Sequence, residues 1–168
     1  MKNSSLSQLK KISLSAIFAA LIFLATAYLP RIPFAGGYIH IGDSILYLAA
    51  AFLPTPYACV IASLGAGLAD ALTGYMIWLP ATLVVKAIMA AFFSCKTQKL
   101  FCTRNLIAAL LAGLVGCIGY YLWEAVLTKS LIVPLESLPY NLIQAAASAI
   151  IFAILAVTLD RFDLKKKI

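Results

Sequence analysis

The fold class is decided by residues 138–159, which read LPYNLIQAAASAIIFAILAVTL and contain no charged side chain. As an α-helix this run would be about 33 Å long, and the hydrocarbon core of a bilayer is about 30 Å thick. Residues 12–29 and 106–122 are two further apolar runs bounded by charged, polar or proline residues. The sequence therefore predicts an all-α integral membrane protein.

The composition supports the same class. Apolar residues make up 64% of the chain and charged residues only 11%, whereas a soluble domain carries about a quarter charged residues. The net charge of +7 does not indicate nucleic-acid binding, because the basic residues lie at the chain ends and in one short loop. The four cysteines form no Cys-x-x-Cys pair and have no histidines at ligand spacing, so no metal site or cofactor is predicted.

The middle of the chain is broken by Pro-Thr-Pro at residues 54–56 and by the loop at residues 74–80. These breaks predict three shorter helices at residues 43–53, 57–72 and 81–93. Together with the three long runs they make six transmembrane helices, and we expect residues 1–168 to form a single transmembrane domain. The first and last of the short helices would need partial shielding by neighbouring loops.

The distribution of basic residues predicts the orientation, since lysine and arginine favour the cytoplasmic side of short loops. With six crossings and a cytoplasmic N-terminus, the outer side holds only Arg31 and Lys129, and Lys86 falls inside the fourth helix. We therefore expect both termini in the cytoplasm. The inner side then holds Lys2, Lys10, Lys11, Lys96, Lys99, Arg104, Arg161, Lys165, Lys166 and Lys167.

The strongly polar residues within the predicted helices all fall in the outer half of the membrane. Burial of an ionised side chain in a bilayer costs several kcal/mol, so such residues usually pair, face a cavity or serve a function. Asp70 and Lys86 are predicted to pair, because they lie on consecutive antiparallel helices. The pair could merely fix helix packing, or Lys86 could donate hydrogen bonds to a ligand in a pocket open to the outside. The full set is Asp43, Asp70, Lys86, Glu124, Asn141 and Gln144.

The predicted outer loops, at residues 31–40 and 75–80, combine glycine, proline and aromatic residues and could cap such a pocket. Tyr38, Tyr75 and Trp78 offer flat faces for a planar heterocycle, although interfacial aromatic residues are also common membrane anchors. His40 could hydrogen-bond a ligand or cap the second helix, and Asp43 is also placed to cap that helix.

The first predicted helix carries Ala16 and Ala20, which align on one face at a spacing of four residues. Small residues at this spacing let another helix approach closely. They suggest a docking face for another membrane protein.

Taken together, these features resemble the substrate-binding, or S, components of energy-coupling factor (ECF) vitamin transporters. The resemblance rests on the alanine-spaced first helix, on GYIHIGD at residues 37–43, on GAGLAD at residues 65–70, and on WLPAT at residues 78–82 leading to Lys86. It covers residues 13–90 well, and beyond that it rests on size and helix number. Within the family, residues 37–43 look most like members associated with hydroxymethylpyrimidine or pyridoxine, and somewhat less like riboflavin-type members.

The resemblance implies a non-catalytic subunit of an ABC importer in a prokaryotic plasma membrane, which binds a water-soluble vitamin from outside. A transmembrane coupling protein, the T component, would dock at Ala16 and Ala20, and two cytoplasmic ATPases would drive toppling of the S component. Consistently, the chain has no Gly-x-x-x-x-Gly-Lys-Ser/Thr phosphate loop. The residues that we expect to bind substrate are Tyr38, His40, Asp43, Tyr47, Asp70, Tyr75, Trp78, Lys86, Glu124, Asn141 and Gln144.

Three functions of other classes remain open on the sequence alone. The chain could be an autonomous carrier in which Asp70 or Glu124 takes up a proton. It could be an intramembrane enzyme that uses Asp43 and Asp70 as an acid–base pair, although no paired catalytic motif is present. It could also be a structural subunit whose polar residues only fix packing.

Overall fold

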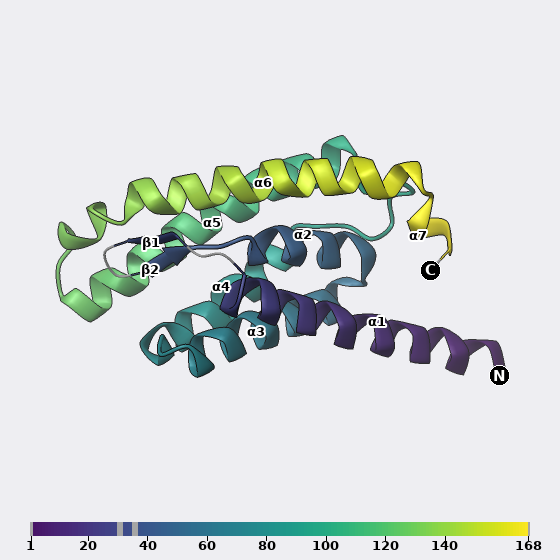
Figure 1. Ribbon diagram of the computed structural model, residues 1–168, viewed down its shortest axis with the longest axis horizontal. Helices are drawn as coiled ribbons and strands as arrows, with labels where there is room; N and C mark the ends of the chain where they lie inside the picture. The colour runs from purple at the N-terminus through teal and green to yellow at the C-terminus, as the bar shows by residue number, and fades with distance from the viewer. Residues whose placement is uncertain (1, 30–31, 35–36, 168) are drawn as a thin grey trace.

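The computed structural model describes residues 2–29, 32–34 and 37–167, and their side chains except at residues 2–7, 33, 34, 37, 38, 166 and 167. Helices occupy all six predicted segments (Figure 1). The elements in chain order are α1 (Lys2–Ala27), β1 (Ile32–Phe34), β2 (Gly37–Ile39), α2 (Gly42–Phe52), α3 (Thr55–Leu72), the 3₁₀ turn η1 (Met76–Trp78), α4 (Leu79–Ala91), α5 (Thr103–Thr128), the 3₁₀ turn η2 (Val133–Leu135), α6 (Leu138–Arg161) and α7 (Leu164–Lys167).

Two helices are longer than the apolar runs that predicted them. Helix α1 begins at Lys2 instead of residue 12, because its polar first turns contain good helix formers that an apolar pattern does not detect. Helix α5 continues past residue 122 to Thr128, and it ends where Lys129 adopts the left-handed conformation with a φ of 53°.

A small β-hairpin interrupts the otherwise helical chain. Strand β1 pairs antiparallel with β2, with Ile32 opposite Ile39. The all-α prediction missed this hairpin, since three-residue strands beside glycines and a proline leave no clear alternating pattern.

The helices run along a common long axis. Figure 1 shows both chain ends at one end of the molecule, and the hairpin and the α5–α6 connection at the other. Helix α3 packs against α1 and α4, α5 packs against α4 and α6, and α2 contacts both α1 and α6. Helix α2 therefore lies in the interior, where nine of its residues are buried.

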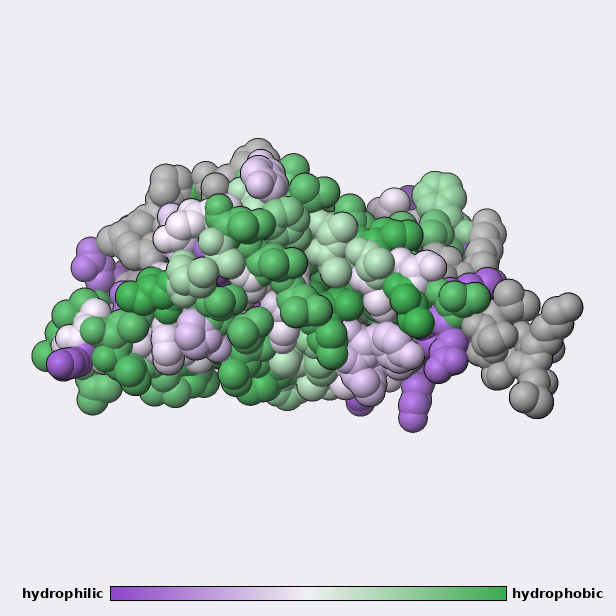
Figure 2. All heavy atoms as spheres, turned by 90° about the horizontal axis from the view of Figure 1, so that it is seen from below, coloured by the Kyte–Doolittle hydropathy of each residue, from purple (hydrophilic) through white to green (hydrophobic). Residues whose placement is uncertain are grey.

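Within the described residues, four helices are long and apolar enough to cross a membrane, over Gln8–Ala27, Thr55–Leu72, Thr103–Thr128 and Leu138–Arg161. The segments Gly42–Phe52 and Met76–Ala91 are shorter. Figure 2 shows hydrophobic residues over the middle of one face and strongly hydrophilic residues mainly toward its two ends. Large apolar side chains such as Leu68, Leu114 and Ile150 are more than half exposed, as expected for a surface in contact with lipid.

Three buried aromatic rings form the centre of the core. The ring of Tyr47 on α2 stacks on Phe93 at 5.0 Å between centroids, and Phe152 on α6 meets both rings edge-on at 6.1 and 5.5 Å. Such pairs stabilise a core beyond the area that they bury. The cluster ties α2 to α6 and fixes the Tyr47 ring in place.

Candidate functional site

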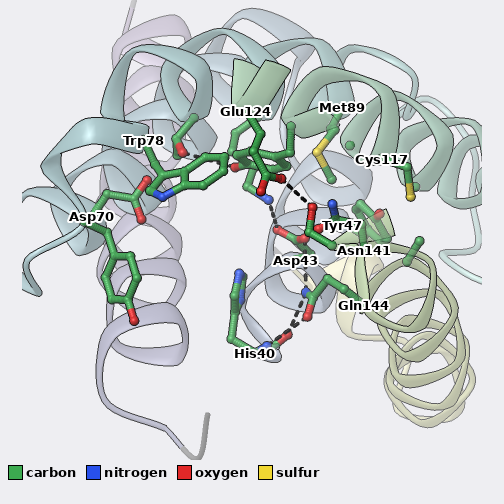
Figure 3. Close-up of a pocket in the computed structure, with 18 residues that line it drawn as sticks. His40, Asp43, Tyr47, Asp70, Trp78, Met89, Cys117, Glu124, Asn141 and Gln144 are labelled. Carbon is green, nitrogen blue, oxygen red and sulfur yellow. Dashed lines mark hydrogen bonds and ion pairs between the residues drawn. The ribbon is translucent and has the colours of Figure 1, made fainter. Parts of the chain in front are cut away.

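A cavity lies between α2, α4, α5 and α6 and is completed by residues of α3 and the η1 segment. It encloses about 790 Å³, including the part that opens to solvent. Its lining combines apolar and aromatic side chains with a few polar groups, which is typical of sites that bind small organic ligands. Its lining, drawn in Figure 3, is His40, Asp43, Tyr47, Asp70, Tyr75, Trp78, Thr82, Lys86, Met89, Gly113, Gly116, Cys117, Tyr120, Glu124, Ser137, Asn141, Gln144 and Ala145.

Ten of the eleven residues predicted to bind substrate line this one cavity. The side chain of the eleventh, Tyr38, lies outside the described residues. Because the ten come from α2, α3, α4, α5, α6 and the loops at one end of the molecule, the fold brings together positions far apart in the sequence. They are His40, Asp43, Tyr47, Asp70, Tyr75, Trp78, Lys86, Glu124, Asn141 and Gln144.

A buried ion pair forms part of the cavity wall. The Nζ atom of Lys86 lies 2.6 Å from Oδ1 of Asp43, and the two side chains are only 4% and 6% exposed. Asp43 lies in the first turn of α2, where the helix dipole also favours a negative charge. The pair joins α2 to α4.

The predicted pairing of Lys86 with Asp70 is wrong, because Lys86 pairs with Asp43. Asp70 lies two residues from the end of α3, and Lys86 lies seven residues from the start of α4. At 1.5 Å per residue the two positions are about 3 Å and about 10 Å from the same end of the helices. The Lys86 side chain also extends toward α2 and α5, where its Nζ lies 5.2 Å from the centre of the Tyr120 ring.

Gln144 connects the segment before α2 to α6. Its Oε1 accepts a hydrogen bond from the His40 amide at 2.8 Å, and its Nε2 donates to the His40 carbonyl at 2.7 Å. The same Nε2 lies 3.2 Å from Oδ2 of Asp43 and 3.2 Å from the Ser148 hydroxyl. A primary amide has two N–H groups, so the protein already occupies both of them. Gln144 thus anchors the chain that enters α2 and also holds the Asp43 carboxylate.

The His40 ring is hydrogen-bonded to the backbone at the start of α2, although the N-cap residue of this helix is Ile41 and no side chain caps it. The Nδ1 atom of His40 accepts a hydrogen bond from the Gly42 amide at 3.0 Å. Asp43 does not cap the helix either, because its carboxylate is bonded to Lys86 and Gln144.

Gly42 is required by this close packing. A Cβ atom at position 42 would lie 2.0 Å from Oγ1 of Thr26 and 2.9 Å from Nδ1 of His40. We expect Gly42→Ala to lower the free energy of unfolding by about 1–3 kcal/mol through this overlap, measured by thermal unfolding in detergent. Thr26→Ala in the same chain should recover part of the loss, and a double variant no more stable than the single one would contradict this account.

Aromatic side chains form the wall next to the ion pair. The Trp78 ring meets the Tyr120 ring at 6.0 Å with an interplanar angle of 62°. The Tyr120 hydroxyl lies 3.1 Å from Oγ1 of Thr82, at hydrogen-bonding distance. A charge placed beside flat aromatic faces suits a planar polar ligand.

Glu124, near the end of α5, and Asn141, in the first turn of α6, line the cavity close to the α5–α6 connection. The Ser137 hydroxyl donates a hydrogen bond to the Glu124 carboxylate and so ties the α5–α6 connection to α5. Figure 3 shows Asp70 and Trp78 on one side of the view, and Asn141 and Gln144 on the other. The acidic residues that line the cavity are Asp43, Asp70 and Glu124.

Eight of the residues that line the cavity were not predicted from the sequence. Tyr120 was detectable, because it precedes Glu124 by four residues and therefore lies on the same helix face. The others are small, apolar or hydroxyl-bearing residues that look like ordinary packing positions. The eight are Thr82, Met89, Gly113, Gly116, Cys117, Tyr120, Ser137 and Ala145.

Ala16 and Ala20 lie on α1, are both exposed and do not line the cavity. They therefore present a small-residue face to the surroundings of the molecule. Among the described residues, no group of three or more His, Cys, Asp and Glu side chains could hold a metal ion.

Comparison with known proteins gives one family. The family model described as ECF-type riboflavin transporter, S component, matches residues 6–161. No curated protein matches the chain. The match includes every helix that lines the cavity, together with the alanine face of α1. The match spans nearly the whole sequence, so this membrane protein belongs to the S-component family of ECF-type transporters.

Proposed function

We propose that this chain captures a planar, water-soluble vitamin from outside the cell and, without catalysis of its own, passes it inward when docked on an ATP-driven coupling module. The observation that carries the proposal is the Asp43–Lys86 ion pair in the cavity wall, beside the rings of Tyr120 and Trp78. A buried ion pair is weak support for stability, because its desolvation offsets most of its attraction. The position of the ion pair in a cavity wall fits a role in ligand recognition better than a role in stability.

The proposal includes an orientation. The four long helices and the two shorter ones, α2 and α4, would together cross the plasma membrane as one domain, with the chain ends inside and the cavity mouth outside. Support comes from the position of both chain ends at the end of the molecule opposite the hairpin. The basic residues of the 92–102 loop and of the chain ends then lie on the cytoplasmic side, as lysine and arginine prefer. Of the two short helices, α2 is largely covered by its neighbours, and α4 buries six of its thirteen residues.

Three ligands are favoured, on two different grounds. The description of the matched family names riboflavin, so riboflavin is the first ligand to test. Residues 37–43 resemble members associated with hydroxymethylpyrimidine or pyridoxine, which are smaller rings that also carry hydroxyl groups. All three offer a flat ring for Trp78 or Tyr120 and oxygen or nitrogen atoms for Lys86 and Asn141.

Purified protein in detergent tests the capture step. We expect one vitamin to bind per chain in the absence of ATP, measured by fluorescence quenching for riboflavin and by calorimetry for hydroxymethylpyrimidine and pyridoxine. The proposal fails if none of the three binds.

Proteoliposomes test the source of energy. We expect uptake only when the T component and its two ATPases are present and ATP is supplied. Uptake by this chain alone under a pH gradient would instead show a proton-coupled carrier, the alternative in which Asp70 or Glu124 takes up a proton.

Gln144, within this proposal, positions other groups and does not contact the ligand, since the protein occupies both of its N–H groups. We expect Gln144→Met to weaken vitamin binding by roughly tenfold to a hundredfold, because two or three buried hydrogen bonds that hold His40 and Asp43 are lost. Stopped-flow binding should show the change mainly as faster dissociation.

Ser148→Ala provides the matched control for this prediction. It removes one partner of Gln144 but leaves the bonds to His40 and Asp43, and it should change the dissociation constant by less than about threefold. Equal losses of affinity in the two variants would show that vitamin binding does not depend on how Gln144 anchors the segment before α2.

A further inference from the structure

The cavity continues beyond the ion pair into the interior. Tyr47 follows Asp43 by four residues on α2, and Met89 follows Lys86 by three residues on α4. At 1.5 Å per residue both lie about 5–6 Å deeper than the charged groups. Gly113, Gly116 and Cys117 of α5 line the same part. Figure 3 shows Met89 and Cys117 on the side away from Asp70 and Trp78. We name this part, lined by these five residues, the inner slot.

Three glycines lie three residues apart on α5, and the reason for a glycine is not the same at each position. A Cβ atom at Gly113 would lie 2.9 Å from Cβ of Ala145, and one at Gly119 would lie 2.5 Å from Cγ2 of Val85. Helix packing therefore requires both of these glycines. A Cβ atom at Gly116 would meet only the Met89 side chain, at 3.6 Å, which is an ordinary contact. Packing does not require glycine at position 116, and the bare backbone there instead widens the cavity.

The second feature of the inner slot is a polar atom without a partner. The Tyr47 hydroxyl is buried and makes no hydrogen bond within the described part of the chain. An unsatisfied buried hydroxyl costs free energy. It cannot easily turn away, because the ring is held between Phe93 and Phe152.

We propose that the inner slot receives the edge of an aromatic heterocycle, which lies against the α5 backbone at Gly116 and presents a hydrogen-bonding ring atom or substituent to the Tyr47 hydroxyl. This inference rests on the proposed function and specifies which part of the ligand lies deepest in the cavity. The sulfur atoms of Met89 and Cys117 provide soft contacts that suit an aromatic edge. A hydrocarbon group would leave the Tyr47 hydroxyl unpaired, so the slot favours a ring edge that carries a nitrogen or oxygen atom.

Tyr47→Phe separates this role from a structural one. We expect the variant to bind the parent protein's vitamin about tenfold more weakly, the effect of one buried hydrogen bond. The thermal midpoint of the ligand-free protein should stay the same or rise, since an unsatisfied hydroxyl is removed. If Tyr47 served only packing, the variant would bind the vitamin with unchanged affinity.

Gly116→Ala tests the shape of the slot, and Gly113→Ala is its matched control. With riboflavin, hydroxymethylpyrimidine and pyridoxine as probes, we expect Gly116→Ala to bind the parent's vitamin at least tenfold more weakly without lowering the ligand-free midpoint. Gly113→Ala should lower that midpoint, because its new methyl group meets Ala145.

The outcomes separate the two proposals. If the parent binds a vitamin and both Tyr47→Phe and Gly116→Ala bind it equally well, the inner slot is not the ring site, although vitamin capture stands. A loss of affinity that follows a matching fall in the ligand-free midpoint also overturns the inference. If the parent binds none of the three probes, the proposed function fails and the inference fails with it.

Discussion

Lys86→Met is expected to lower the free energy of unfolding by about 3–5 kcal/mol and to abolish vitamin binding. The change leaves the Asp43 carboxylate, which is 6% exposed, buried without its cation, and an uncompensated buried charge is strongly destabilising. Gln144 would still hold the carboxylate through a 3.2 Å hydrogen bond. Chemical unfolding in detergent and equilibrium binding with the three vitamins measure the two effects.

The double variant Asp43→Asn with Lys86→Met separates stability from recognition. Replacement of a buried ion pair by uncharged groups is often close to neutral, so the free energy of unfolding should return to within about 1–2 kcal/mol of the parent. Binding should stay lost, because the cavity then lacks its charged pair. If the double variant binds a vitamin as tightly as the parent, the ion pair only fixes helix packing.

Ala16→Leu combined with Ala20→Leu is expected to reduce ATP-driven uptake to background while vitamin binding stays unchanged. Both alanines are exposed on α1, and small residues at this spacing allow a partner helix to approach closely. Leucine is compatible with lipid but holds the partner away. Uptake into proteoliposomes with the coupling module, and binding to the isolated chain, give the two readouts.

Ala146→Leu is the matched control for this prediction, since Ala146 is also exposed but lies on α6. It should transport at the parent's rate. Normal uptake by the α1 double variant, or equal inhibition by the α6 variant, would exclude the alanine face as the specific docking surface.

The helices were predictable because apolar runs and proline breaks depend on local sequence. The proline breaks before α3 and α4 placed both helices within about two residues of their observed bounds, which are Thr55–Leu72 and Leu79–Ala91. The polar start of α1 and the β1–β2 hairpin were missed, since neither has an apolar periodicity. Both lie at the ends of the helical core, where local signals are weakest.

Ten of the residues that line the cavity were predictable from the sequence, but their contacts with one another were not. Polar residues near the ends of membrane helices must turn inward, so Glu124, Asn141 and Gln144 could be grouped from depth alone. The partner of Lys86 depends on the direction in which its side chain points and on the depth of α2, which sequence order does not reveal. Tyr47 shows the same limit, because its unpaired hydroxyl is visible only after the rings of Phe93 and Phe152 have fixed it.

Native mass spectrometry tests the capture of a vitamin most directly. The protein would be purified from cells supplied with riboflavin, hydroxymethylpyrimidine and pyridoxine, beside the Asp43→Asn, Lys86→Met double variant. We expect the parent chain to carry the added mass of one vitamin, and the double variant to appear only at the mass of the bare chain. Parent protein that remains bare with all three vitamins present would contradict the account.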